Sequence, residues 1–204
     1  MQIRFPLSIL MMAGALAGAT GCATIRTTDP PRTATEQFLL SVAAARAIDQ
    51  LSSESLRDRR VFIETTYLGS AQTANEYAFL VGELRAKLLL SGIRLVPKRE
   101  EAQILLELRS GGLGIDRLEY LLGIPALYLP QASQNTVPVA TPELAIIKST
   151  KQRGYASVAY VAYWIDTGEV VAHSGPFIGR TIREDWWILG TGPRTVGNIP
   201  PAEK

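Results

Sequence analysis

The residues that could do chemistry are few, and their spacing assembles no catalytic set. The chain has one histidine, His173, next to Ser174, and a histidine can act as a general base toward a serine hydroxyl. No nucleophile-elbow sequence surrounds a serine, and a lone histidine on a predicted strand is more often a surface or packed residue than a base or ligand. Gly111, Gly112 and Gly114 follow a strand as a phosphate loop would, but they lack the Lys-Ser/Thr ending.

Carboxylates offer the remaining route to catalysis. Asp116 with Glu119, and Glu184 with Asp185, are pairs that a metal-free hydrolase could use as acid and base. Pairs of this kind are also expected on a solvated surface. The sequence therefore predicts a non-enzymatic protein without a metal or cofactor, and a periplasmic hydrolase with a carboxylate site stays as an alternative.

The only cysteine, Cys22, stands where a leader would end. Residues 1–21 carry one positive charge, Arg4, followed by an apolar run from Leu7 to Ala19, which is the layout of a secretory signal and too short to span a bilayer. The cysteine has no disulfide partner and no metal-site spacing. We therefore expect residues 1–21 to be a signal peptide.

The junction resembles the lipobox of bacterial lipoproteins, with Ala19 in place of the more usual leucine. The resemblance implies cleavage between Gly21 and Cys22 and attachment of diacylglycerol and palmitate to Cys22; the alternative is a free thiol near an ordinary cleavage site. Several acyl chains on one residue give stable membrane attachment. Ala23, where aspartate would resemble an inner-membrane retention signal, favours the periplasmic face of the outer membrane.

The rest of the chain predicts a tether and one domain. Residues 22–32 contain threonine and proline without periodicity, which suits a tether, and residues 33–204 are long enough for a single periplasmic domain. The chain has 21 basic and 19 acidic residues, and Arg4 leaves with the leader. This near-neutral balance argues against nucleic-acid binding, which needs a basic surface.

Helical and β periodicities alternate along the domain. The Thr33/Glu36 and Thr73/Glu76 spacings are capping boxes that open helices over 34–51 and up to Gly92. Strands are predicted over 60–66, 93–96, 103–109, 155–165 and 169–173, the last two joined by a turn at 166–168. This order predicts an α/β (α+β) fold: a mixed sheet with two helices on one face, a long apolar insert between strands, and a late β-hairpin.

Two segments do not fit this plain fold. The insert, residues 111–154, is too apolar for a disordered loop, so it either packs over the open face of the sheet or forms a contact surface for a partner, another copy or the membrane. Trp186 and Trp187 suit either the core, which we favour because Gly190, Gly192 and Pro193 suggest a tail folded back onto the sheet, or an interface. The candidate interaction surface comprises Leu121, Leu122, Ile124, Leu127, Tyr128, Leu129, Trp186 and Trp187.

Several segments together resemble an uncharacterised family of bacterial lipoproteins, described only as a domain of unknown function. They are residues 21–24, 33–37, 60–63, 66–69, 123–126 and 186–193. A looser likeness is to the periplasmic α/β domain of the curli-export lipoprotein, on the strand 102–110 and the Thr-Gly-Glu-Val turn at 167–170. In that exporter, long inserted segments become membrane-spanning hairpins of an oligomeric channel. Pro125, Pro130 and the lack of strict alternation fit such a hairpin poorly, so we carry over the fold and not the pore.

These features rank three functions. We expect first a lipid-anchored, non-enzymatic scaffold or assembly module of the cell envelope, which contacts an envelope partner or itself through the insert and the two tryptophans. Second is an oligomeric export-channel component resembling the curli exporter. Third is the carboxylate hydrolase, which would need an enclosed pocket whose carboxyl pKa values are raised.

Overall fold

The described part of the chain folds as helices and strands within one compact unit that begins at Arg32. The computed structural model describes residues 32–68, 74–126, 128–129, 139–140 and 142–199. The predicted signal peptide, Gly21, Cys22, Thr73 and Leu127 lie outside these residues. The elements are α2 (Ala34–Ile48), β1 (Arg60–Glu64), α3 (Ala74–Leu90), β2 (Arg94–Leu95), β3 (Ile104–Ile124), β4 (Tyr128–Leu129), β5 (Val139–Ala140), β6 (Leu144–Trp164), β7 (Val170–Ile188) and β8 (Thr191–Gly197), with short 3₁₀ turns at Glu54–Leu56 and Arg99–Glu101.

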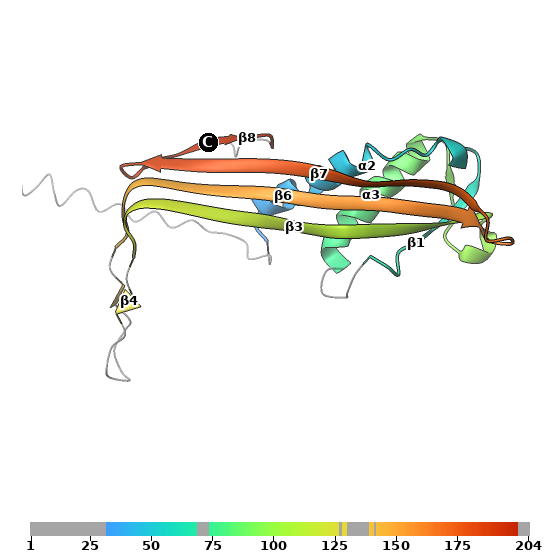
Figure 1. Ribbon diagram of the computed structural model, residues 1–204, viewed down its shortest axis with the longest axis horizontal. Coiled ribbons are helices and arrows are strands. Elements are labelled where there is room, and N and C mark those ends of the chain that lie inside the picture. The colour runs from blue at the N-terminus through green and yellow to red at the C-terminus, as the bar shows by residue number, and fades with distance from the viewer. Residues whose placement is uncertain (1–31, 69–73, 127, 130–138, 141, 200–204) are drawn as a thin grey trace, which may run out of the picture. The chain divides into compact units, whose positions relative to one another are not determined.

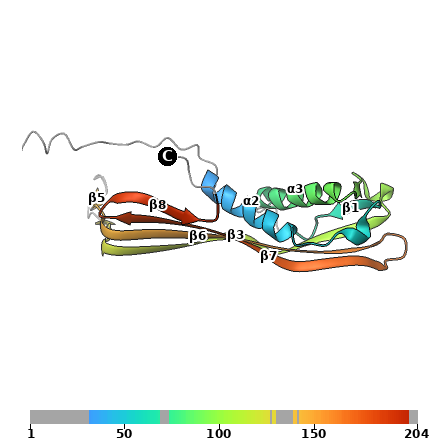
Figure 2. The same cartoon turned by 90° about the horizontal axis from the view of Figure 1, so that it is seen from above.

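The main sheet has six strands in the order β2-β1-β3-β6-β7-β8 (Figure 1). Strand β1 runs parallel to β2 and β3, and the pairs β3–β6, β6–β7 and β7–β8 are antiparallel. Both helices lie on one side of this sheet (Figure 2). The predicted fold class, a mixed sheet with two helices on one face, is confirmed.

Helix α2 packs directly on the middle of the sheet. Its predicted capping box is present: the Glu36 N–H donates to Thr33 Oγ1 at 3.3 Å, and the Thr33 N–H donates to Glu36 Oε2 at 2.9 Å. Two strand glycines let the helix backbone approach. A Cβ built on Gly154 would lie 2.7 Å from the Leu39 carbonyl oxygen, and one on Gly179 would lie 1.8 Å from that of Ala43.

The hydrophobic core lies between these helices and only part of the sheet. Strand β3 contributes Ile104, Leu106 and Leu108, each with no exposed surface. The other core side chains come from both helices, β1, the inner part of β6 and the segments that connect these elements: Ala43, Ala44, Ala47, Ile48, Leu51, Leu56, Val61, Leu68, Leu80, Leu84, Leu88, Ile93, Ala156, Val158, Tyr160 and Ala162. All of these strand residues lie at one end of the long strands.

Three strands are much longer than the periodicity predicted. The strand expected at 103–109 runs to Ile124, the strand expected at 155–165 already begins at Leu144, and the strand expected at 169–173 runs to Ile188. Residues 111–124 and 144–154 therefore extend strands β3 and β6 and do not fold back over the sheet. The predicted strands are shorter because they rest on the alternation of apolar and polar residues along the sequence. That alternation reflects burial against the core, and it is lost where the core ends.

Candidate interaction surface on the outer half of the sheet

The strands β3, β6, β7 and β8 continue past the helices as two adjoining hairpins. We call this region the outer half. Its innermost row of paired residues is Arg117, Gln152, Arg183 and Gly197, and it extends outward from there along all four strands. The rest of the sheet is the inner half. Of the described helices, α2 reaches this row with its first turn, where Arg183 Nη1 donates to Thr35 Oγ1 at 3.3 Å.

The register sorts the side chains of the outer half onto two faces, because directly paired residues point the same way and neighbours alternate. The helix-side face, which carries Arg183, also carries Arg117, Glu119, Leu121, Lys148, Thr150, Gln152, Asp185, Trp187 and Thr195. The open face carries Leu118, Tyr120, Leu122, Ile147, Ser149, Lys151, Glu184, Trp186, Ile188, Arg194 and Val196. One face is thus mainly polar and the other mainly apolar.

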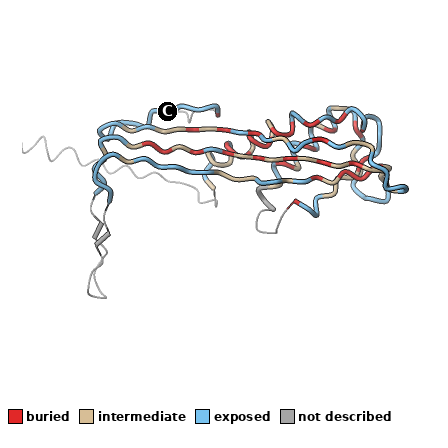
Figure 3. Tube along the Cα trace, in the orientation of Figure 1, coloured by how far each residue is buried: buried red, intermediate tan, exposed pale blue. Residues whose placement is uncertain are grey.

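The open face leaves large apolar side chains in contact with solvent. Leu122 and Val196 are each 60% exposed, and Tyr120 is 58% exposed. Leu118, Ile147, Trp186 and Ile188 on the same face are exposed as well. The outer half is accordingly pale blue over long stretches of Figure 3. Contiguous exposed apolar surface of this kind marks a contact with a partner or a membrane.

One ion pair lies within the innermost row of this apolar surface. Lys151 Nζ lies 3.2 Å from Glu184 Oε2, and Ser149 Oγ donates to Glu184 Oε1 at 3.2 Å. Ser149 is fully buried beneath its neighbours. The pair therefore presents no net charge on the open face.

The helix-side face carries three ion pairs of its own. Arg117 pairs with Glu119 at 2.5 Å, Lys148 with Glu143 at 2.9 Å, and Arg183 with Asp185 at 2.9 Å. The first two pairs line an open depression together with Thr150 and Trp187. Because each charge has a partner, this surface is strongly polar yet electrically balanced.

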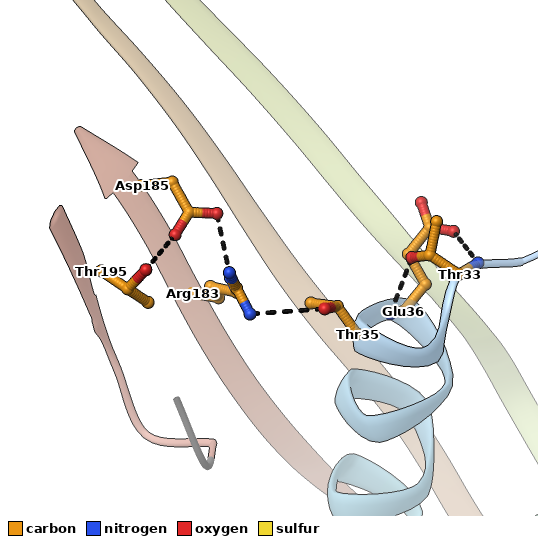
Figure 4. A network of polar contacts seen from close by, with 6 residues as sticks. All are labelled: Thr33, Thr35, Glu36, Arg183, Asp185 and Thr195. Atoms are coloured by element: carbon orange, nitrogen blue, oxygen red, sulfur yellow. Dashed lines mark hydrogen bonds and ion pairs between the residues drawn. The ribbon is translucent and has the colours of Figure 1, made fainter. Parts of the chain in front are cut away.

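A hydrogen-bond network joins this face to the start of helix α2 (Figure 4). Arg183 links Thr35 to Asp185, and Asp185 Oδ1 accepts a hydrogen bond from Thr195 Oγ1 at 2.5 Å. Arg183 is only 9% exposed, so Asp185 compensates a charge that is largely out of water. The network fixes β8 and β7 to the helix that follows directly on the predicted tether.

The structure divides the predicted interaction residues between the two faces. Leu122, Ile124 and Trp186 are exposed, and Trp186, at 38% exposure, is not in the core that we favoured. Leu121 and Trp187 share a row on the helix side. Leu127 and the side chains of Tyr128 and Leu129 lie outside the described residues. The tail does return to the sheet, as predicted, but it joins the edge of the sheet: residues 191–197 pair with β7 as strand β8.

The candidate catalytic residues do not converge. Residues 116 and 119, and likewise 184 and 185, point to opposite faces of their strands, as do His173 and Ser174. The Ser174 hydroxyl accepts a hydrogen bond from the Ser52 N–H at 3.0 Å, which gives it a structural role. Within the described residues, no three His, Cys, Asp or Glu side chains group as a metal would require.

The titratable groups with shifted pKa values serve the inner half. Burial lowers the pKa of Lys87, whose Nζ donates to the Ile48 and Asp49 carbonyl oxygens at 2.8 and 2.7 Å and so ties α3 to the end of α2. A hydrogen bond donated to Glu107 raises the pKa of the Tyr163 hydroxyl. Both shifts follow from contacts that hold the fold together.

Sequence reasoning missed the Thr35–Arg183–Asp185–Thr195 network and the Lys151–Glu184 pair. A signal for both was present, since residues 148–152 and 183–186 place their side chains alternately on the two faces. Without the strand assignment, the charges in these segments predict only an ordinary solvated surface.

Together, the fold and this surface define an α+β protein whose sheet extends beyond its helices as two adjoining amphipathic hairpins. The chain belongs to DUF6655, a family of unknown function whose model matches residues 16–202. The predicted relation to an uncharacterised family is thereby confirmed, and the family brings no assigned activity. No curated protein matches the chain. No helix among the described residues is long and apolar enough to cross a membrane.

Proposed function

We propose that this protein is a lipid-anchored subunit of an oligomeric export channel in the outer membrane. The observation that carries the proposal is the outer half of the sheet, where four adjacent strands leave the helices with one polar and one apolar face. Strands that separate water from lipid need this division of side chains. Of the functions that the sequence allowed, the channel now accounts for more of the surface than a general scaffold does.

The dimensions of the outer half suit a membrane. Residues 117–124 of β3 extend about 26 Å at roughly 3.3 Å per residue, close to the ~25 Å apolar band of outer-membrane strands. Pro125, which argued against a membrane-spanning hairpin, lies just after the end of β3 at Ile124 and interrupts no strand pairing. The objection from that residue therefore falls away.

The two faces would have different surroundings. The open face, with its exposed leucine, isoleucine, valine and aromatic side chains, would contact lipid. Two of its charges, Lys151 and Glu184, form a neutral pair, which is less costly in an apolar surrounding than a single charge, and the third, Arg194, lies on the edge strand β8. The helix-side face, with its balanced ion pairs, would line water.

Four strands cannot act in a membrane alone, because the backbone groups at both sheet edges would lack hydrogen-bond partners. Several subunits are therefore needed to close a ring of hairpins. The predicted lipid at Cys22 would hold each subunit at the membrane surface, and the short tether to α2 would keep the hairpins close to it. Replacing Cys22 with serine tests the anchor, since that variant should stay unprocessed or lose its lipid.

The proposal is tested on the full-length protein extracted from membranes in mild detergent. We expect particles of several subunits by light scattering and electron microscopy, and stepwise conductance after incorporation into planar lipid bilayers. The decisive variants are Leu122→Arg and its matched control Leu121→Arg, which place the same charge on neighbouring residues of opposite faces. An arginine facing lipid costs about 2–4 kcal/mol near the middle of the bilayer and less towards its surfaces.

Leu122→Arg should therefore abolish membrane insertion and conductance, whereas Leu121→Arg should keep both. Monomeric wild-type particles without conductance would overturn the proposal and return the anchored scaffold to first place. Equal loss in the two variants would also contradict it, because the faces would then not differ in their surroundings.

A further inference from the structure

Both lateral edges of the outer half lack a strand partner within the described chain. Strand β1 pairs with β3 only from Ile104 to Glu107, so the same edge of β3 is unpaired from Leu108 to Ile124. At the other side of the sheet, β8 pairs with β7 along one edge and with no described strand along the other. Unpaired N–H and C=O groups in rows of this length are a template for another strand.

Parts of the inner edges, by contrast, are occupied. The edge of inner β7 is covered where Asn198 exchanges hydrogen bonds with the Ile182 N–H and C=O, and where Arg46 Nη1 donates to the Arg180 carbonyl oxygen at 2.6 Å. Strand β1 covers β3 from Ile104 to Glu107. Among the described residues, the β3 edge is therefore unpaired from Leu108 through the outer half to Ile124, and β8 has an unpaired edge of its own.

The direction of the strands fits these two edges to each other. Successive strands from β3 through β6 and β7 to β8 alternate in direction, so β3 and β8 run opposite ways. If the β8 edge of one copy lies beside the β3 edge of the next, the new pair is antiparallel and the alternation continues from copy to copy. Two copies joined through the same edge, β3 to β3 or β8 to β8, would leave the other edge exposed.

Opposite charges accompany the two edges. Asp116 on β3 and Arg194 on β8 are both exposed, both belong to the open face, and neither has a side-chain partner within the described chain. Within one copy, Arg194 is level with Tyr120, four residues along β3 from Asp116. Bringing the two charges together between copies therefore needs a stagger along the strands, as closed rings of tilted strands require.

We infer that copies of this chain join head to tail, with the β8 edge of one copy paired antiparallel to the unpaired β3 edge of the next and Arg194 facing Asp116 of the partner copy. The inference rests on the proposed channel and specifies its subunit contact. A contact between two different surfaces of identical subunits generates a ring when its rotation closes.

Cysteine crosslinking between two differently tagged full-length chains tests the contact in intact membranes. One chain carries Asp116→Cys and the other Arg194→Cys; paired residues of antiparallel strands lie within disulfide reach. On mild oxidation, cells that express both variants should give a dimer that carries both tags. Cells that express either variant alone should give no dimer. Glu83→Cys on the exposed side of α3, mixed with Arg194→Cys, is the matched control and should give no dimer.

Charge exchange gives a second measurement. Asp116→Arg and Arg194→Asp should each reduce the oligomeric fraction about fivefold, the effect of roughly 1 kcal/mol, and the two changes in one chain should restore it. Dimers from a single cysteine variant would overturn the inference in favour of a two-fold contact. If the wild-type protein conducts as an oligomer but the mixed cysteine variants give no dimer, the head-to-tail contact is wrong while the channel stands. A monomeric, non-conducting wild type would instead overturn the channel itself.

Discussion

The three long strands have different surroundings at their two ends. In the inner half, β3 buries Ile104, Leu106 and Leu108 completely beneath the helices. In the outer half the same strand leaves Leu122 60% exposed. Strands β6 and β7 change in the same way, from buried Val158 to exposed Ile147 and from the tightly packed Gly179 to exposed Ile188.

The difference separates folding from assembly. The inner half contains the hydrophobic core and the contacts between sheet and helices, except for those made by the first turn of α2. It therefore accounts for the stability of the isolated chain. The outer half is held by strand pairing and by the network through Arg183, and its apolar face gains nothing until something else covers it. A change in one half should therefore alter unfolding, and a change in the other should alter association.

The largest expected contrast lies within β3. Leu106→Ala removes a fully buried side chain and should lower the free energy of unfolding by about 2–5 kcal/mol, whereas Leu122→Ala should change it by less than about 0.5 kcal/mol. Urea denaturation of the variants in the Cys22→Ser background, without lipid, measures both. A loss of more than about 2 kcal/mol in Leu122→Ala would mean that the outer half is already covered in the single chain.

Gly179 and Gly114 provide the next contrast. A methyl group at Gly179 would overlap the Ala43 carbonyl, while Gly114 has open space around the added carbon. Gly179→Ala should force α2 away from the sheet and cost about 1–3 kcal/mol in thermal or urea unfolding; Gly114→Ala should be close to neutral. Equal effects would show that α2 does not rest on β7 as closely as described.

A smaller effect is expected at the junction of the two halves. Asp185→Ala leaves the largely buried Arg183 with only its Thr35 contact and frees Thr195, so it should cost about 1–2 kcal/mol and speed hydrogen exchange in β8. Glu119→Ala, which removes the partner of an exposed arginine, is the control and should cost less than about 0.5 kcal/mol. Unchanged exchange in β8 would contradict a role of the network in fixing that strand.

The inner half was predictable from sequence and the outer half was not. Helix α2 was marked by the Thr33/Glu36 capping box and by apolar residues at helical spacing, and the late hairpin by its Asp-Thr-Gly turn. The apolar spacing reports burial against a core. Among the described residues the core ends near Leu113, and farther along β3 the large apolar side chains lie on the other face, so the alternation no longer reads as one continuous pattern.

The candidate surface was found in part. Sequence alone named Leu122, Ile124 and Trp186 as candidate interaction residues, and all three are exposed, although the sequence favoured the core for the tryptophans. The faces, edges and ion pairs were beyond it, because they depend on the register that sets Lys151 beside Glu184 and Arg183 beside Gly197. Register is a property of paired strands, and a single sequence does not display the pairing.

The smallest expected effect concerns the Lys151–Glu184 ion pair. The coupling energy between its two side chains should depend on what covers the open face. In the lipid-free chain the pair is partly solvated, and a double-mutant cycle with Lys151→Met and Glu184→Gln should give a coupling of about 0.2–1 kcal/mol in urea unfolding. In the assembled membrane form, either single variant leaves one charge in an apolar surrounding, so the coupling measured from the oligomeric fraction should be larger. The double variant, which leaves no charge, should assemble better than either single one. Equal coupling in both settings would mean that the open face stays in water after assembly, and the outer half would then be a surface for a polar partner protein.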